Sequence, residues 1–116
     1  MLDIFDDYNW EYVFAYADRP EWVMESEDAR DGKPTSAPIK REDVVEVIAY
    51  ADGMNDELDW LMLGKVSDGR YFYIAAGCDY TGWGCQEWGR SYASYDRARL
   101  EQFAVTFDER IRLKMS

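Results

Sequence analysis

Short apolar runs separated by acidic or glycine-containing turns fill the middle of the chain. Residues 44–51 (VVEVIAYA) are rich in β-branched side chains, and residues 60–66 (WLMLGKV) and 71–74 (YFYI) are almost wholly apolar. Runs of this length and composition predict β-strands. The run at 71–74 is apolar on both faces, so we expect it at the centre of a sheet covered on both sides. A helix beginning at Arg41 is the alternative for the first run.

The segments between these runs predict how the strands connect. Asp68-Gly69 is a tight-turn signal, because this pair tolerates the positive φ that hairpin loops need. Residues 52–59 form an acidic loop before the second strand, and Gly64 within that strand suggests a bulge. Residues 91–94 add a short fourth strand. We therefore expect an antiparallel meander of three to four strands.

A helix is predicted over residues 3–17. Asp7 or Asn9 can cap it, and Pro20 ends it. Apolar residues recur at helical spacing: Trp10, Val13, Phe14 and Ala17. The alternative is a strand, because aromatic residues also alternate: Trp10, Tyr12, Phe14 and Tyr16. Residues 21–38 then form an acidic, partly mobile connector.

Two short helices are predicted at the C-terminus. Residues 96–103 carry Ala98, Leu100 and Phe103, which can face the sheet in part. Thr106 and Glu109 have the spacing of a capping box. The predicted fold is a single α+β domain over residues 1–116: a small antiparallel β-meander packed with an N-terminal helix and two short C-terminal helices.

Residues 76–86 (AGCDYTGWGCQ) resemble the signature of an uncharacterised family of small bacterial and phage proteins. Members often carry an acid where this chain has Gly84, and Ser67 replaces a lysine in the family's Lys-Asp-Gly-Arg turn. The resemblance extends over residues 39–113, including the Arg41–Val44 segment and Trp60. Because the family has no assigned activity, the resemblance implies a folded unit and no mechanism.

The formal net charge of −11 is unevenly distributed along the chain. Residues 1–59 hold seventeen acidic and five basic residues, a balance of −12, and the remainder sums to +1. Such a field disfavours nucleic acid and anionic membranes as direct partners and favours a basic protein. No apolar run approaches a membrane span, and the acidic start is unlike a signal peptide. A cytoplasmic location is expected, and unpaired edge strands leave the oligomeric state open.

Few catalytic or metal chemistries fit this composition. The chain has no histidine, which excludes histidine-based triads and metal sites. The acidic loop at 52–59 lacks the spacing of a twelve-residue calcium loop. Cys78 and Cys85 flank a turn and are expected as free thiols, either as small buried residues or as a reactive pair. No catalytic residue, metal or cofactor is predicted.

Two sets of residues are candidate binding surfaces. The first is an acidic face: Asp3, Asp6, Asp7, Glu11, Asp18, Glu25, Glu27, Asp28, Asp52, Asp56 and Glu57. The second is an aromatic patch beside the glycine turn, with core filling as the alternative: Asp79, Tyr80, Trp83 and Trp88. We expect a non-enzymatic acidic binding protein, and a phage-encoded DNA mimic that inhibits a host nucleic-acid defence system is a concrete form. The alternative is a small-ligand binder or enzyme built on the turn at 77–88, using Asp79 and the thiols.

Overall fold

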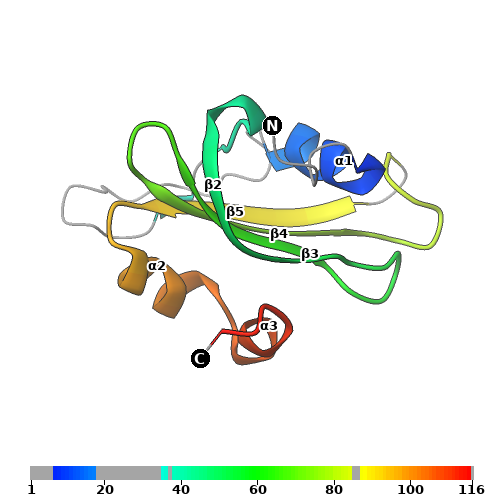
Figure 1. The fold of residues 1–116 in the computed structure, drawn as a ribbon. Coiled ribbons are helices and arrows are strands. Elements are labelled where there is room, and N and C mark those ends of the chain that lie inside the picture. The colour runs from blue at the N-terminus through cyan, green and yellow to red at the C-terminus, as the bar shows by residue number, and fades with distance from the viewer. Residues whose placement is uncertain (1–6, 18–34, 37, 85–86, 116) are drawn as a thin grey trace.

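The computed structural model describes residues 7–17, 35–36, 38–84 and 87–115. Along the chain these form α1 (Tyr8–Ala17), β1 (Thr35–Ser36), the one-turn 3₁₀ helix η4 (Arg41–Asp43), β2 (Val44–Ala51), β3 (Trp60–Val66), β4 (Tyr71–Cys78), β5 (Glu87–Ser94), α2 (Arg97–Ala104) and α3 (Phe107–Arg112). α1 lies on one side of the sheet, and α2 and α3 lie on the other (Figure 1). This arrangement confirms the predicted α+β fold.

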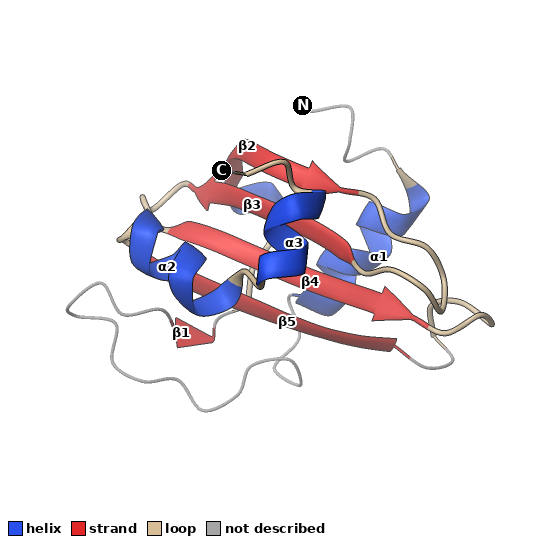
Figure 2. Ribbon diagram, turned by 90° about the horizontal axis from the view of Figure 1, so that it is seen from below, coloured by secondary structure: helices blue, strands red, loops and turns tan. Residues whose placement is uncertain are grey.

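The sheet is antiparallel, with the strand order β1-β5-β4-β3-β2 (Figure 2). β2 to β5 form the predicted meander, but two predictions need correction. β5 spans eight residues rather than residues 91–94, because Glu87 to Arg90 pair with β4 although they show no strand-like pattern of their own. The connector predicted at 21–38 contains β1, whose Thr35 and Ser36 pair with β5. A two-residue strand is too short to carry a hydrophobic period.

α1 begins where Asp7 caps it. One carboxylate oxygen of Asp7 accepts hydrogen bonds from the backbone N–H groups of Asn9 (2.8 Å) and Trp10 (3.3 Å), as expected of an N-cap. The helix therefore starts at Tyr8 rather than at residue 3, and residues 3–6 lie outside the described part of the chain. The helix predicted from the apolar spacing is therefore confirmed, and the strand alternative is wrong. The inward face of α1 is buried: Trp10, Val13, Phe14, Tyr16 and Ala17.

Strand β4 divides the interior into two apolar layers, as its two-sided apolar pattern predicted. Phe72, Ile74 and Cys78 pack on the α1 side, whereas Tyr73 and Ala75 pack on the side of α2 and α3. All five are fully buried. Because both faces of β4 are covered, the strand needs no polar positions.

The C-terminal helices have the predicted capping box but not all of the predicted contacts. Asp96 caps α2, accepting from the Arg99 N–H at 3.2 Å, and Thr106 and Glu109 form the capping box of α3. Leu100 is buried against the sheet, whereas Ala98 and Phe103 are exposed, contrary to expectation. The helix turns Leu100 and Ala104, four residues apart, toward the sheet, which leaves Phe103 on the flank.

The edge strand β2 is irregular at two points. Its register against β3 shifts between Val44 and Glu46 and again between Val47 and Ala49, so the predicted bulge lies on the strand facing Gly64 rather than in β3. Bulges twist an edge strand and interrupt its hydrogen-bonding groups, which discourages pairing with another chain. A Cβ at Gly64 would lie 2.4 Å from the Glu46 carbonyl oxygen and 2.6 Å from the Phe72 ring.

We expect the Gly64→Ala variant to lose about 2 kcal/mol of stability, because the added methyl group must displace backbone on one side and a core ring on the other. Urea denaturation of both proteins measures this difference. Gly84→Ala is the matched control, since nothing lies within 4 Å of a Cβ there and only its positive φ of 93° opposes the change. Equal stabilities for the Gly64→Ala variant and the wild type would contradict the tight β2–β3 approach.

Candidate functional site: the acidic loop end

Three separate segments meet at one end of the sheet (Figure 1). The backbone N–H of Asp56, in the β2–β3 loop, donates to the Cys78 carbonyl at the end of β4 (2.7 Å). The Trp83 indole, in the β4–β5 loop, donates to the Asn9 side chain at the start of α1 (3.1 Å). We call this region the loop end; it comprises residues 7–10, 52–59, 79–84 and Glu87.

Trp83 anchors the β4–β5 loop to the α1 layer. Its ring stacks on Tyr12 (centroids 6.2 Å apart, 4° between planes) and on Tyr16 (5.9 Å), and it meets Trp60 at 5.3 Å. Gly82 and Gly84, on either side, have φ values of 97° and 93°. Glycine adopts this conformation without strain, so the chain can turn inward at Trp83 and out again. For Trp83, the contacts fit core filling rather than an exposed patch.

The other members of the predicted aromatic patch have separate positions. The Trp88 side chain is 39% exposed and lies over Gly77, with its indole N–H donating to the Asp59 carboxylate (2.8 Å). Tyr80 is 78% exposed at the loop tip. Asp79 stabilises the turn itself, because its carboxylate accepts from the N–H (3.0 Å) and hydroxyl of Thr81. The structure thus leaves Tyr80 and part of Trp88 exposed.

Seven acidic residues of the described chain belong to the loop end: Asp7, Asp52, Asp56, Asp59, Asp79, Glu57 and Glu87. Several of them also hold the loops together, since Asp52 accepts from the Trp10 indole N–H (2.8 Å) as Asp59 does from Trp88. Arg112 reaches this end but donates to the backbone carbonyl of Asp52 (3.0 Å) rather than to a carboxylate. Negative charge is therefore concentrated here.

Ion pairs of the described residues lie elsewhere. Arg70 pairs with Asp68 in the β3–β4 turn, and Arg90 pairs with Glu109 beneath the C-terminal helices. Glu101 on α2 pairs with Arg97 and, at 3.5 Å, with Arg110. Acids in those regions are accompanied by bases, so the charge surplus of the described chain is local rather than uniform.

The structure describes only some residues of the predicted acidic face. Asp7, Asp52, Asp56 and Glu57 gather at the loop end. The remaining members, except Glu11, lie outside the described residues: Asp3, Asp6, Asp18, Glu25, Glu27 and Asp28. Sequence reasoning missed Asp59 and Glu87, which belong to the same end. The sequence offered a signal for Asp59, which directly precedes a predicted strand, but none for Glu87, because the first half of β5 was not predicted.

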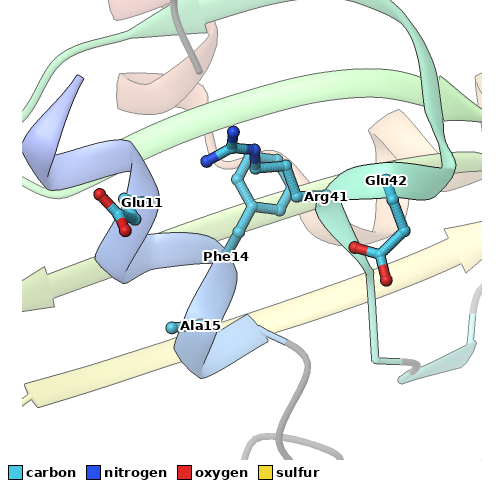
Figure 3. Close-up of a pocket in the computed structure, with 5 residues that line it drawn as sticks. All are labelled: Glu11, Phe14, Ala15, Arg41 and Glu42. Atoms are coloured by element: carbon cyan, nitrogen blue, oxygen red, sulfur yellow. The ribbon is translucent and has the colours of Figure 1, made fainter. Parts of the chain in front are cut away.

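Glu11 lies apart from this group, beside a hollow of about 200 Å³ between α1 and η4. Phe14 and Ala15 line the hollow from α1, and Arg41 and Glu42 line it from η4 (Figure 3). In this view the guanidinium group of Arg41 lies between the two carboxylates. The charges here are mixed, so we do not include the hollow in the acidic site.

Cys78 shows the features of a packing residue. Its side chain is fully buried, and its thiol donates to the side-chain amide oxygen Oδ1 of Asn55 at 3.4 Å. Burial, with the neighbouring charges of Asp79 and Glu87, raises the pKa of the Cys78 thiol. A raised pKa disfavours the nucleophilic thiolate. Cys85, its predicted companion, lies outside the described residues.

Metal sites and membrane-spanning helices are absent from the described part of the chain. It holds no group of three or more residues placed to bind a metal ion. None of its helices combines the length and the apolar composition needed to cross a membrane. We also compared the chain with protein-family models, curated proteins and solved structures, and found no match to any of them.

Proposed function

We propose that this is a non-enzymatic binding protein whose loop end docks onto a basic surface of a protein partner. The supporting observation is the gathering of seven acids from three chain segments at one end of the sheet, while the rest of the described chain holds nine acids and ten bases, so its charges nearly balance. Complementary charge of this kind raises association rates and selects partners by sign.

The exposed aromatic side chains at and beside the loop end suit such an interface. Tyr80 projects at the loop tip, and Trp88 offers part of its ring. Aromatic residues contribute strongly to binding because they bury a large area with few rotatable bonds. A rigid base supports them, since Trp83 and the hydrogen bonds of Asp52 and Asp59 fix both loops. A preordered surface loses less entropy on binding.

We infer that the partner is a nucleic-acid-binding enzyme, because such enzymes carry the extended basic channels that an acidic surface can occupy. In this form the protein is a DNA mimic that inhibits a host defence enzyme of the restriction or CRISPR type, acting in the cytoplasm. The support for this narrower proposal is the net charge of −11 and the family resemblance to phage proteins.

The test is a pair of charge-matched variants. Asp56→Asn/Glu57→Gln removes two exposed acids from the loop end, and Glu42→Gln/Glu46→Gln removes two exposed acids from the η4–β2 region. The protein, immobilised at low ionic strength, is used to recover a basic partner from a host lysate. That partner must then release the protein when duplex DNA is added.

We expect the loop-end variant to raise the Kd for that partner on the order of 10-fold and to flatten its dependence on salt, because two charge contacts are lost. The η4–β2 variant should change the Kd less than about 2-fold. Equal changes of the Kd in the two variants would refute the proposal. A Kd that does not change with added salt or duplex DNA would refute it as well.

A further inference from the structure

A second site lies on the opposite side of the sheet from α1. A hollow of about 280 Å³ opens between β2, α2 and the chain just after α3. Ile48 and Ala49 of β2 form one apolar wall, and Leu113 and Met115 form another. Charged groups of Arg97, Glu101 and Lys114 line the rest. None of these residues belongs to the loop end, so this site is independent of the proposed function.

The charge around the hollow is positive, in contrast to the whole chain. Glu101 is the acid of the lining, and its side chain is 15% exposed. It accepts from Arg97 Nε at 2.9 Å and lies 3.5 Å from Arg110 Nη2. Its single charge is thus offset by two guanidinium groups. Arg97 keeps 45% of its side chain exposed, and Lys114 is exposed as well. A ligand in the hollow therefore meets a surplus of positive charge.

The backbone at the end of α3 pairs two of its carbonyl groups with its own N–H groups. Lys114 has a φ of 57°, the left-handed conformation that closes many helices. Its N–H donates to the Ile111 carbonyl (3.1 Å), and the Met115 N–H donates to the Arg110 carbonyl (2.9 Å). These two carbonyls, which would otherwise repel an anion, are already bonded. Glycine is the usual residue at such a position, so a lysine side chain here is an unusual choice.

We propose that this hollow binds a small anionic amphiphile: a carboxylate joined to a short apolar body. The carboxylate would lie against Lys114 and the open side of Arg97, and the apolar body would lie against Ile48, Leu113 and Met115. The volume is near the lower limit of small-molecule sites, about 300 Å³. The hollow has the volume of about nine water molecules. It therefore suits a ligand of roughly six to eight carbon atoms.

Hexanoate is the probe that tests this site. Titration of the full chain, followed by the NMR signals of the Met115 and Ile48 methyl groups and the Lys114 amide, should show saturable binding with a Kd on the order of 1 mM, a typical affinity for so few ligand atoms. Hexanol and hexylamine, at the same concentrations, should move these signals much less, because neither carries a negative charge.

Three variants separate charge from fold. Lys114→Gly removes the ammonium group at a position whose backbone favours glycine, so the helix end is retained, and it should raise the Kd for hexanoate about 10-fold. Lys114→Arg keeps the charge and should stay within about 2-fold. Lys40→Gln removes an exposed lysine away from the hollow and should leave the Kd unchanged. Equal binding of hexanol and hexanoate, or equal loss in the Lys40→Gln and Lys114→Gly variants, would overturn the proposal.

Discussion

We expect the free energy of unfolding of the Trp83→Ala variant to be about 3 kcal/mol lower than that of the wild type. Losses of this size follow when large aromatic side chains are removed from packed sites. Trp83 contacts three aromatic rings, from Tyr12, Tyr16 and Trp60, and its indole N–H bonds to Asn9. Its side chain is partly buried against the α1 core, so its removal takes away the packing between α1 and the β4–β5 loop. Chemical denaturation followed by circular dichroism measures the loss.

Trp88→Ala is the matched control for this prediction, because it deletes the same side chain from a position that is 39% exposed. It should cost about 1 kcal/mol, since less area is returned to water and one hydrogen bond is lost. Trp83→Phe should fall between the two, because it keeps a stacked ring and loses the bond to Asn9. If Trp83→Ala and Trp88→Ala were equally mild, Trp83 would not be the anchor of the loop.

The second large effect is expected at Glu109, where three interactions converge. Its carboxylate accepts from the Thr106 N–H (3.0 Å) and contacts Arg90 Nη2 through both oxygens (2.7 and 2.9 Å). The Tyr73 hydroxyl, buried with no hydrogen-bond partner of standard geometry among the described residues, lies close enough for the Glu109 charge to act with burial in raising its pKa. The side chain of Glu109 is 12% exposed, so water replaces these contacts poorly.

We expect Glu109→Ala to cost about 3 kcal/mol, combining a lost charged hydrogen-bond pair with a lost helix cap. Glu109→Gln should cost about half as much, because glutamine can still complete the capping box but cannot pair with Arg90 as an anion. Asp108→Ala removes an exposed acid from the same first turn and should cost about 0.5 kcal/mol, the size of a helix-dipole contact. Urea titrations of the three variants rank these contributions, and similar values for Glu109→Ala and Asp108→Ala would contradict the assignment.

The stabilisation from Glu109 should depend on pH in a defined direction. Burial opposes its ionisation, but the Thr106 N–H and the Arg90 guanidinium outweigh burial and hold the pKa of Glu109 below its ordinary value. A depressed pKa stabilises the fold above the unfolded-state value of about 4.3 and ceases to do so as the pH falls through the folded-state value. The stability gap between the wild type and Glu109→Gln should therefore be full at neutral pH and narrow below about pH 4.

The residues of the signature-like segment now have physical roles that are independent of any family. Gly77 leaves space for Trp88 and Asp59, since a Cβ there would lie 2.5 Å from the atoms of both. Cys78 fills the core, and Asp79 with Thr81 shapes the turn. Gly82 allows Trp83 to turn inward. The segment is thus explained by the packing of one loop, and the function we propose depends on the acids around it.

Local chemistry was enough to predict most of the elements. Asp7, Asp96 and the Thr106–Glu109 box start their helices through bonds to N–H groups two or three residues away, so the sequence alone specifies them. The apolar runs of β3 and β4 likewise predict buried strands, because a strand that is covered on both faces has no polar positions. The concentration of acids in residues 1–59 is likewise a property of the sequence.

Contacts between distant segments were decided by the tertiary structure. The pairings Trp83–Asn9, Trp10–Asp52 and Trp88–Asp59 span 74, 42 and 29 residues, and no local pattern encodes them. The same holds for β1, whose two residues become a strand only because β5 offers its edge. Composition determined how much negative charge the chain carries. In the described part of the chain, the fold decided where negative charge gathers, because it brings two loops and the start of α1 to one end of the sheet.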